Sequence, residues 1–67
     1  MSVARTTEIS AFSPKSFDAA VHEGIERAKE SLRNVSHVWV KDHEVVLKDG
    51  EIEGYKAKLK VTFVLDS

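Results

Sequence analysis

The stretch "NVSHVWVKDHEVVLKDG", residues 34–50, marks the point where the sequence changes from a helical to an extended pattern. Before Asn34, apolar residues recur every three or four positions, whereas after it they alternate with polar residues, as at Val38 and Val40. A period of two residues predicts a β-strand with one apolar face. Asp49-Gly50 then predicts a tight turn. The stretch therefore predicts the first arm of a β-hairpin that follows directly on a helix.

The segment before this stretch is predicted to be an amphipathic helix of roughly five turns. Ser13 is expected to be its N-cap, and Pro14 its first helical residue, where the missing N–H costs nothing. Gly24 would permit a close approach by a neighbouring backbone, and Asn34 is expected to end the helix. Its apolar stripe would consist of Phe17, Val21, Ile25, Ala28 and Leu32.

Two further strands are predicted, one on each side of this helix and hairpin arm. Residues 3–10, "VARTTEIS", are rich in β-branched residues and predict a short first strand. The closing segment alternates strictly, with Tyr55, Ala57, Leu59, Val61, Phe63 and Leu65 on one face and Lys56, Lys58, Lys60, Thr62 and Val64 on the other. A helix with one apolar stripe must cover the apolar face of the sheet. The prediction is an α+β fold of order β-α-β-β, a three-stranded antiparallel sheet wrapped around one helix, in a single domain of residues 1–67.

Size and composition limit the classes of protein to which the chain can belong. The 67 residues include no cysteine, so disulfides and thiolate metal sites are excluded. The formal net charge of −1 argues against nucleic-acid binding, which favours a strong positive excess. No apolar run approaches the ~20 residues of a membrane span, and the first residues show no apolar signal-peptide core. We therefore expect a cytoplasmic protein with no nucleic-acid or membrane partner.

The predicted hairpin is longer than the predicted helix, which bears on assembly. A helix of about 20 residues spans ~30 Å, whereas a hairpin arm of about 12 residues spans ~40 Å. The far end of the hairpin, with Val45, Leu47 and Ile52, would lack cover from within the chain. Small domains without disulfides rarely stand alone. We therefore expect association with copies of the same chain, and a monomeric binding module is the alternative.

Taken together, these segments resemble a known family, the dodecins. The frame from Ser13 to Val35 is similar to the family's helix, which reads Ser-Pro-x-Ser-aromatic, then Ala-Val/Ala, Ile-x-Arg-Ala and Leu-Arg-Asn. "DGEIEGYKAKLKVTFVLD", residues 49–66, resembles its closing strand, and "TEI" at residues 7–9 fits its first strand. The resemblance covers almost the whole chain. It implies a hollow, roughly spherical homododecamer that binds flavin, either FMN or riboflavin, at subunit interfaces and stores or buffers it.

The residues that would contact the flavin depart from the family pattern. In flavin-binding dodecins a tryptophan stands three residues after the Asn that ends the helix, a position that His37 occupies here. The single tryptophan, Trp39, comes two residues later, where the family more often has glutamate, and Lys56 replaces a glutamine-like residue. Trp39 could still offer a stacking plane, displaced by one pleat step of ~6.6 Å. The candidate cofactor-binding residues are therefore His37, Trp39 and Lys56.

Each candidate site also has a simpler interpretation. Trp39 could be an interface packing residue, since aromatic residues are enriched at such surfaces. The lysine row of Lys56, Lys58 and Lys60 could bind the phosphate of FMN or of coenzyme A, or could pair with nearby carboxylates. An acidic group consists of Asp42, Glu44, Asp49, Glu51 and Glu53. It could bind a calcium ion with carboxylate ligands from several copies of the chain, or it could be ordinary solvated charge. The other histidines, His22 and His43, are expected on solvated or interface faces.

The sequence contains no catalytic constellation. It lacks a cysteine nucleophile, a glycine-rich phosphate loop and a spaced Ser/His/Asp set. We therefore expect a binding protein rather than an enzyme. The leading interpretation is a dodecin-like homododecamer that binds flavin. The alternative is a dodecin-like assembly without flavin that has a structural role or binds a metal ion such as calcium, or another anionic ligand such as coenzyme A.

Overall fold

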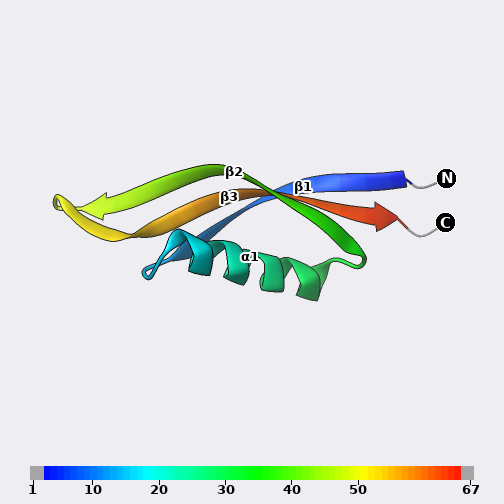
Figure 1. Cartoon of the computed structure of the whole chain (residues 1–67), viewed down its shortest axis with the longest axis horizontal. Helices are drawn as coiled ribbons and strands as arrows, with labels where there is room; N and C mark the ends of the chain where they lie inside the picture. The colour runs from blue at the N-terminus through cyan, green and yellow to red at the C-terminus, as the bar shows by residue number, and fades with distance from the viewer. Residues whose placement is uncertain (1–2, 66–67) are drawn as a thin grey trace.

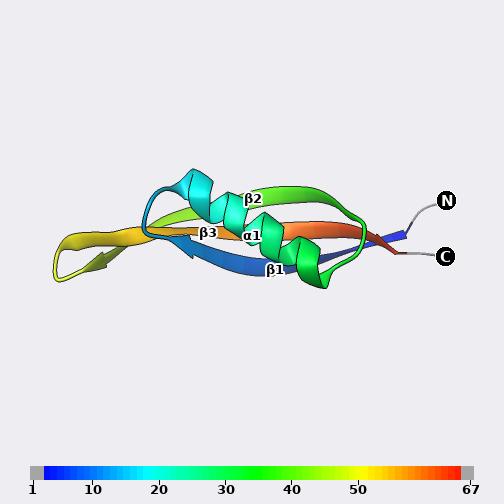
Figure 2. The same ribbon diagram turned by 90° about the horizontal axis from the view of Figure 1, so that it is seen from below.

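Three antiparallel strands and one helix make up the computed structural model, which describes residues 3–65. The elements follow in the order β1 (Val3–Ser13), α1 (Phe17–Ser31), β2 (Val35–Lys48) and β3 (Glu51–Leu65). The central strand is β3, which pairs antiparallel with β1 on one side and with β2 on the other. The helix crosses one face of the sheet diagonally (Figures 1 and 2). The predicted α+β fold of order β-α-β-β is thus confirmed.

The start of α1 differs from the prediction. The N-cap is Ser16, whose Oγ accepts a hydrogen bond of 3.0 Å from the backbone N–H of Ala19. Ser13 is instead the last residue of β1, and its Oγ accepts a hydrogen bond of 3.0 Å from the N–H of Lys15. Pro14 consequently lies in the turn before the helix. The expectation that Ser13 and Pro14 begin the helix was wrong. With 15 residues, α1 has about four turns and is shorter than the roughly five turns expected.

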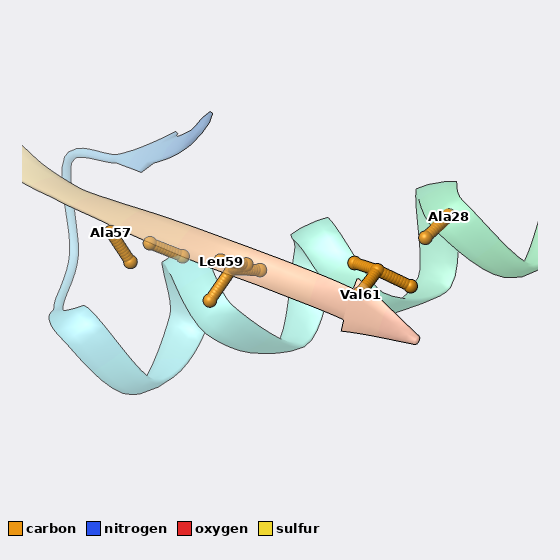
Figure 3. Close-up of a cluster of buried hydrophobic side chains, with 5 residues drawn as sticks. Ala28, Ala57, Leu59 and Val61 are labelled. Carbon is orange, nitrogen blue, oxygen red and sulfur yellow. The ribbon is translucent and has the colours of Figure 1, made fainter. Parts of the chain in front are cut away.

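The hydrophobic core lies between α1 and β3, as Figure 3 shows. It is built largely from small side chains: Ala20, Ala28, Ala57, Leu59 and Val61 are buried. Gly24 lies in the same row of the helix, where a β-carbon would be 2.7 Å from Cδ1 of Leu59 and 3.0 Å from Cβ of Ala11. The most buried line of α1 is therefore Ala20, Gly24 and Ala28, with larger members of the predicted stripe on its flanks. A close approach was expected at Gly24, but side-chain atoms of Leu59 and Ala11 make it, not a neighbouring backbone.

Strand β1 is longer than predicted, because its ladder with β3 continues to the pair Ser13–Tyr55. Strand β2 pairs with β3 along its whole length but with register shifts. Two of these shifts leave one extra residue on β2, Ser36 and Lys41, as β-bulges. The second bulge lies in "KDHE" and reverses the alternation. Val40 and His43 therefore both lie on the helix side of the sheet, like their partners in β3. The pattern break in "KDHE" is thereby explained.

The hairpin of β2 and β3 extends well beyond the end of the helix (Figure 1). Asp49 and Gly50 form its turn with φ values of 52° and 80°, the left-handed region that two-residue hairpin turns require. The principal-axis extents are 50 × 18 × 14 Å, so the chain is markedly elongated. Apolar side chains near the tip are exposed: Val45 by 44%, Leu47 by 59% and Ile52 by 60%. The predicted lack of cover within one chain is thus present in the structure.

Candidate ligand-binding face

The side of the sheet opposite α1, here named the outer face, carries most of the polar residues singled out in the sequence. Because Ala57, Leu59 and Val61 of β3 face the helix, the alternating residues between them face the other way. The register then assigns their partners on β1 and β2 to the same face. The outer face comprises Glu8, His37, Trp39, Asp42, Glu44, Lys56, Lys58 and Lys60, together with Lys41 at the bulge.

Trp39 lies near the middle of the outer face and is 60% exposed. Its neighbour on β3 is Lys60, whose Nζ lies 5.6 Å from the centroid of the indole ring. An ammonium at this distance is attracted by the negative face of the ring, with an interaction of about 0.5–1 kcal/mol at an exposed site. A large aromatic surface and a cation are therefore presented together to solvent.

An ion pair crosses this face from one edge of the sheet to the other. Nζ of Lys41, on β2, donates a hydrogen bond of 3.2 Å to Oε2 of Glu8, on β1. The hydrogen bond and the charge of Lys41 lower the pKa of Glu8, with smaller effects from the charges of Lys60 and Lys58. Glu8 is therefore held in its charged form, with Lys41 as its direct partner.

His37 lies on the same face as Trp39, two residues earlier in β2. Its Nδ1 is 3.0 Å from Oγ of Ser36, and that hydroxyl donates to the carbonyl oxygen of Thr62 at 3.4 Å. The imidazole is therefore oriented by the bulge residue Ser36, and it remains exposed beside Trp39.

Lys56 is separated from the other two candidate residues within one chain. It pairs with Glu44 in the register, and its Nζ is 4.0 Å from Oε1 of that residue. Trp39 pairs with Lys60, four residues further along β3, which corresponds to about 13 Å at 3.3 Å per residue. The structure thus brings His37 and Trp39 together, and Lys56 lies on the same face at a distance.

The sequence reasoning did not identify the contacts that Trp39 and Lys41 make. Lys60 was singled out only as a member of the lysine row, and the partners of these lysines were described only as nearby carboxylates. The Trp39–Lys60 contact depends on the register between β2 and β3, and the Lys41–Glu8 contact on the register of all three strands. The bulges at Ser36 and Lys41 shift that register. A count of alternating residues along one strand contains no such signal.

His43 lies on the helix side of the sheet, in contact with the ring of Phe17. Its ring centroid is 4.8 Å from that of Phe17, which is in turn 5.0 Å from that of Tyr55. Both pairs are edge-to-face, the arrangement that aromatic quadrupoles favour. His43 is nonetheless exposed, as expected for a solvated or interface position, and it anchors the hairpin to the first turn of α1.

A groove lies along the free edge of β1, where α1 crosses it. This groove has a volume of about 540 Å³. Its floor is apolar, from Ile9, Ala11 and Ala28, and its rim carries Glu23 and Arg27. Within residues 3–65, no group of three or more histidine or acidic side chains could hold a metal ion. In the same residues, no helix is long and apolar enough to cross a membrane.

Comparisons with known proteins agree with this architecture. The Dodecin family model matches residues 3–66. A dodecin from Streptomyces davaonensis superposes with a TM-score of 0.92 at 35% sequence identity, covering 98% of this chain and 97% of that one. A dodecin from Streptomyces coelicolor gives a TM-score of 0.91 at 29% identity, covering 98% and 94%. No curated protein sequence matches the chain.

A third similar structure is described by the ion that it binds. It is the calcium dodecin of Mycobacterium tuberculosis, a calcium-chelating antigen with a novel calcium-binding site. Its TM-score is 0.84 at 28% identity, and the match covers 96% of this chain and 91% of that one.

The matching family places the chain among small, non-enzymatic ligand-binding proteins and implies a homo-oligomer. The chain belongs to the dodecin family, because the family model spans all but its first two residues and its last residue. The resemblance read from the sequence is therefore confirmed, and so is the expectation that the chain is not an enzyme.

Proposed function

We propose that the chain forms a homododecamer that binds a flavin, FMN or riboflavin, against Trp39 on the outer face and thereby stores or buffers it. The observation that carries the proposal is the 60% exposure of a tryptophan in the middle of a polar sheet face. An isolated chain gains nothing from leaving so large an apolar surface in water. A planar aromatic ligand, or a second copy of the chain, would cover it.

The residues of the outer face fit a flavin chemically. The exposed indole of Trp39 offers a stacking plane, and His37 beside it offers a second, smaller ring. Lys60 supplies a positive charge within 5.6 Å of the indole centroid. A bound flavin would supply an isoalloxazine ring for stacking. In such a complex, Trp39 would hold the ring and exclude water from one side of it.

Lys56 would take part from a neighbouring copy. Within one chain it lies about 13 Å along β3 from the residue that pairs with Trp39. At an interface between two copies, the Lys56 of one can approach the Trp39 of the other. The proposed site, formed by His37, Trp39 and Lys56, is therefore a shared one, and it requires the assembly.

Self-association is supported by two surfaces that one chain leaves uncovered. The hairpin tip exposes Val45, Leu47 and Ile52, and the groove at the edge of β1 has an apolar floor. β1 and β2 are both edge strands, whose free backbone groups are usually protected in stable proteins. A closed shell of twelve copies would cover all of these surfaces.

The test is a fluorescence titration combined with a mass measurement. Riboflavin and FMN are each titrated with purified protein while flavin emission is followed, and the mass is measured by light scattering. We expect strong, stoichiometric quenching and a mass of twelve chains. Undiminished emission at micromolar protein, with a mass of twelve chains, would contradict flavin binding and support the alternative of a structural, calcium-binding or coenzyme A-binding assembly.

Two variants of Trp39 separate ligand stacking from interface packing. W39L keeps apolar bulk but removes the aromatic plane, whereas W39F keeps a smaller plane. Base–aromatic stacking contributes about 1–3 kcal/mol in other ring-binding proteins, so W39L should weaken flavin binding by roughly tenfold or more, and W39F by less. If W39L instead lowers the assembled mass and leaves quenching per dodecamer unchanged, Trp39 is an interface residue only.

A further inference from the structure

Lys60 occupies the centre of the outer face, between the two groups that define its chemistry. On β3 it pairs with Glu8 of β1 on one side and with Trp39 of β2 on the other. Its ammonium reaches toward the indole, 5.6 Å from the ring centroid. Any ring that stacks on Trp39 will therefore lie next to this charge.

The neighbouring carboxylate already has a different partner. Glu8 is 3.2 Å from Nζ of Lys41, and its lowered pKa reflects that contact first. A second lysine of the outer face, Lys56, is paired with Glu44 at 4.0 Å. Of the lysines on the described outer face, Lys60 is the one whose recorded contact is a neutral ring. Lys60 acts on Glu8 only through its charge and forms no ion pair within residues 3–65, so its ammonium can still pair with an anion supplied from outside the chain.

The outer face as a whole carries a net positive charge, the same sign as that of Lys60. This face carries four ammonium groups and three carboxylates. The ammonium groups belong to Lys41, Lys56, Lys58 and Lys60, and the carboxylates to Glu8, Asp42 and Glu44. Lys58 follows on the same face of β3, one pleat step from Lys60. Although the whole chain has a net charge of −1, the surface around Trp39 is positive.

We propose that Lys60 is the specificity-determining residue of this face, and that it selects a ring bearing an anionic tail over the same ring without one. This inference rests on the proposed flavin binding and names its ligand class, the phosphorylated flavin. A neutral ring stacked on Trp39 displaces the Lys60 ammonium from the indole and supplies no charged partner for it. A phosphorylated ring offers Lys60 a charged partner, so the ammonium gains an ion pair as it moves from the indole.

The experiment compares the dissociation constants of FMN and riboflavin, measured by quenching, for the wild type and for variants of confirmed assembly. An exposed charge pair changes affinity by on the order of fivefold. We expect FMN to bind about fivefold more tightly than riboflavin in the wild type, with the ratio falling toward one in K60Q and being kept in K60R. In K48Q, the same change at the hairpin tip, the ratio should stay that of the wild type. The ratio should also fall as NaCl is raised toward 1 M, because salt screens exposed charges.

A variant with the opposite expected effect on the FMN preference controls for a merely structural effect of K60Q. E8Q removes a negative charge beside Lys60, so it should raise the preference for FMN while leaving riboflavin affinity unchanged. Equal affinities in the wild type, or a preference that survives in K60Q, would overturn the inference while flavin binding stands. Absence of quenching by both ligands would refute the proposed function itself, and this inference with it.

Discussion

Lys41 and Glu8 join the two edge strands of the sheet across the central strand, with 3.2 Å between Nζ and Oε2. The two residues are 33 positions apart, and neither belongs to β3, which lies between them. The contact is possible because Lys41 is the extra residue of a bulge, where the side chain is freed from the regular alternation. The pair thus links the bulge in β2 to the free edge of β1.

The stabilisation from this pair should depend on pH. The pKa of Glu8 is lowered in the folded chain, so its contribution is present above the unfolded value of ~4.3 and is lost as the pH falls through the lowered value. At pH 7, K41Q should melt slightly below the wild type, by a few degrees for an exposed pair. The difference should close at pH 3, where Glu8 is increasingly protonated, as measured by circular dichroism at a fixed protein concentration.

The matched control for this prediction is K48Q, which removes the same charge at the hairpin tip. It should melt near the wild type at both pH values, because Lys48 forms no ion pair within residues 3–65. A K41Q deficit that persists undiminished at pH 3 would mean that Lys41 acts through packing of its aliphatic stem.

Gly24 is predicted to tolerate no side chain without loss of stability. A β-carbon would approach Leu59 Cδ1 to 2.7 Å and Ala11 Cβ to 3.0 Å. Overpacking costs about 1–3 kcal/mol, whereas replacing glycine by alanine in a helix gains about 1 kcal/mol. G24A should therefore lose about 1 kcal/mol of the free energy of unfolding, and G24V more, as measured by urea denaturation at one protein concentration.

The comparison for Gly24 is E30A, a substitution on the exposed side of the same helix. It should change the free energy of unfolding by less than about 0.5 kcal/mol. Should G24A prove as stable as the wild type, the Leu59 side chain must rotate away at little cost, and the tight approach would be no constraint on the fold.

Much of the fold follows from the sequence because each element carries its own local signal. The change of period at Asn34 and the turn at Asp49-Gly50 were both read correctly, and a close approach does occur at Gly24, although side chains and not a backbone make it. Ser13 was misread because two serines, Ser13 and Ser16, stand three residues apart before the same apolar run. Both are good N-caps, and the choice between them is made by the pairing of Ser13 with β3, which is not local.

The candidate site was predictable to a smaller extent, for the same reason. The alternation of β2 correctly put His37 and Trp39 on one face. The neighbours of Trp39 depend instead on how three strands align, and each bulge changes that alignment by one residue. Lys60 and Lys56 look equivalent in the sequence, yet they pair with Trp39 and Glu44 respectively.

The assignment of the N-cap leads to a prediction at single-residue level. Replacing a serine N-cap by alanine costs about 1 kcal/mol and frees the backbone N–H that it bound. S16A should therefore speed hydrogen exchange at the amide of Ala19, whose N–H is 3.0 Å from Ser16 Oγ. S13A should leave Ala19 protected and affect the amide of Lys15 instead. The reverse pattern, measured by NMR-detected exchange, would restore Ser13 as the N-cap.

The hairpin tip gives the most direct test of assembly. Leu47 and Ile52 pair across the two strands and are 59% and 60% exposed, so in an assembly each would be covered by another copy. Fully burying such a side chain contributes about 1.5–3 kcal/mol, and a charged replacement would instead have to be desolvated. L47K and I52K should each shift the mass measured by light scattering from that of the assembly toward smaller species. K48Q, adjacent in the same tip, should keep the wild-type mass. If L47K and I52K also keep that mass, the tip lies outside the contacts between copies, and the groove along β1 becomes the surface to mutate.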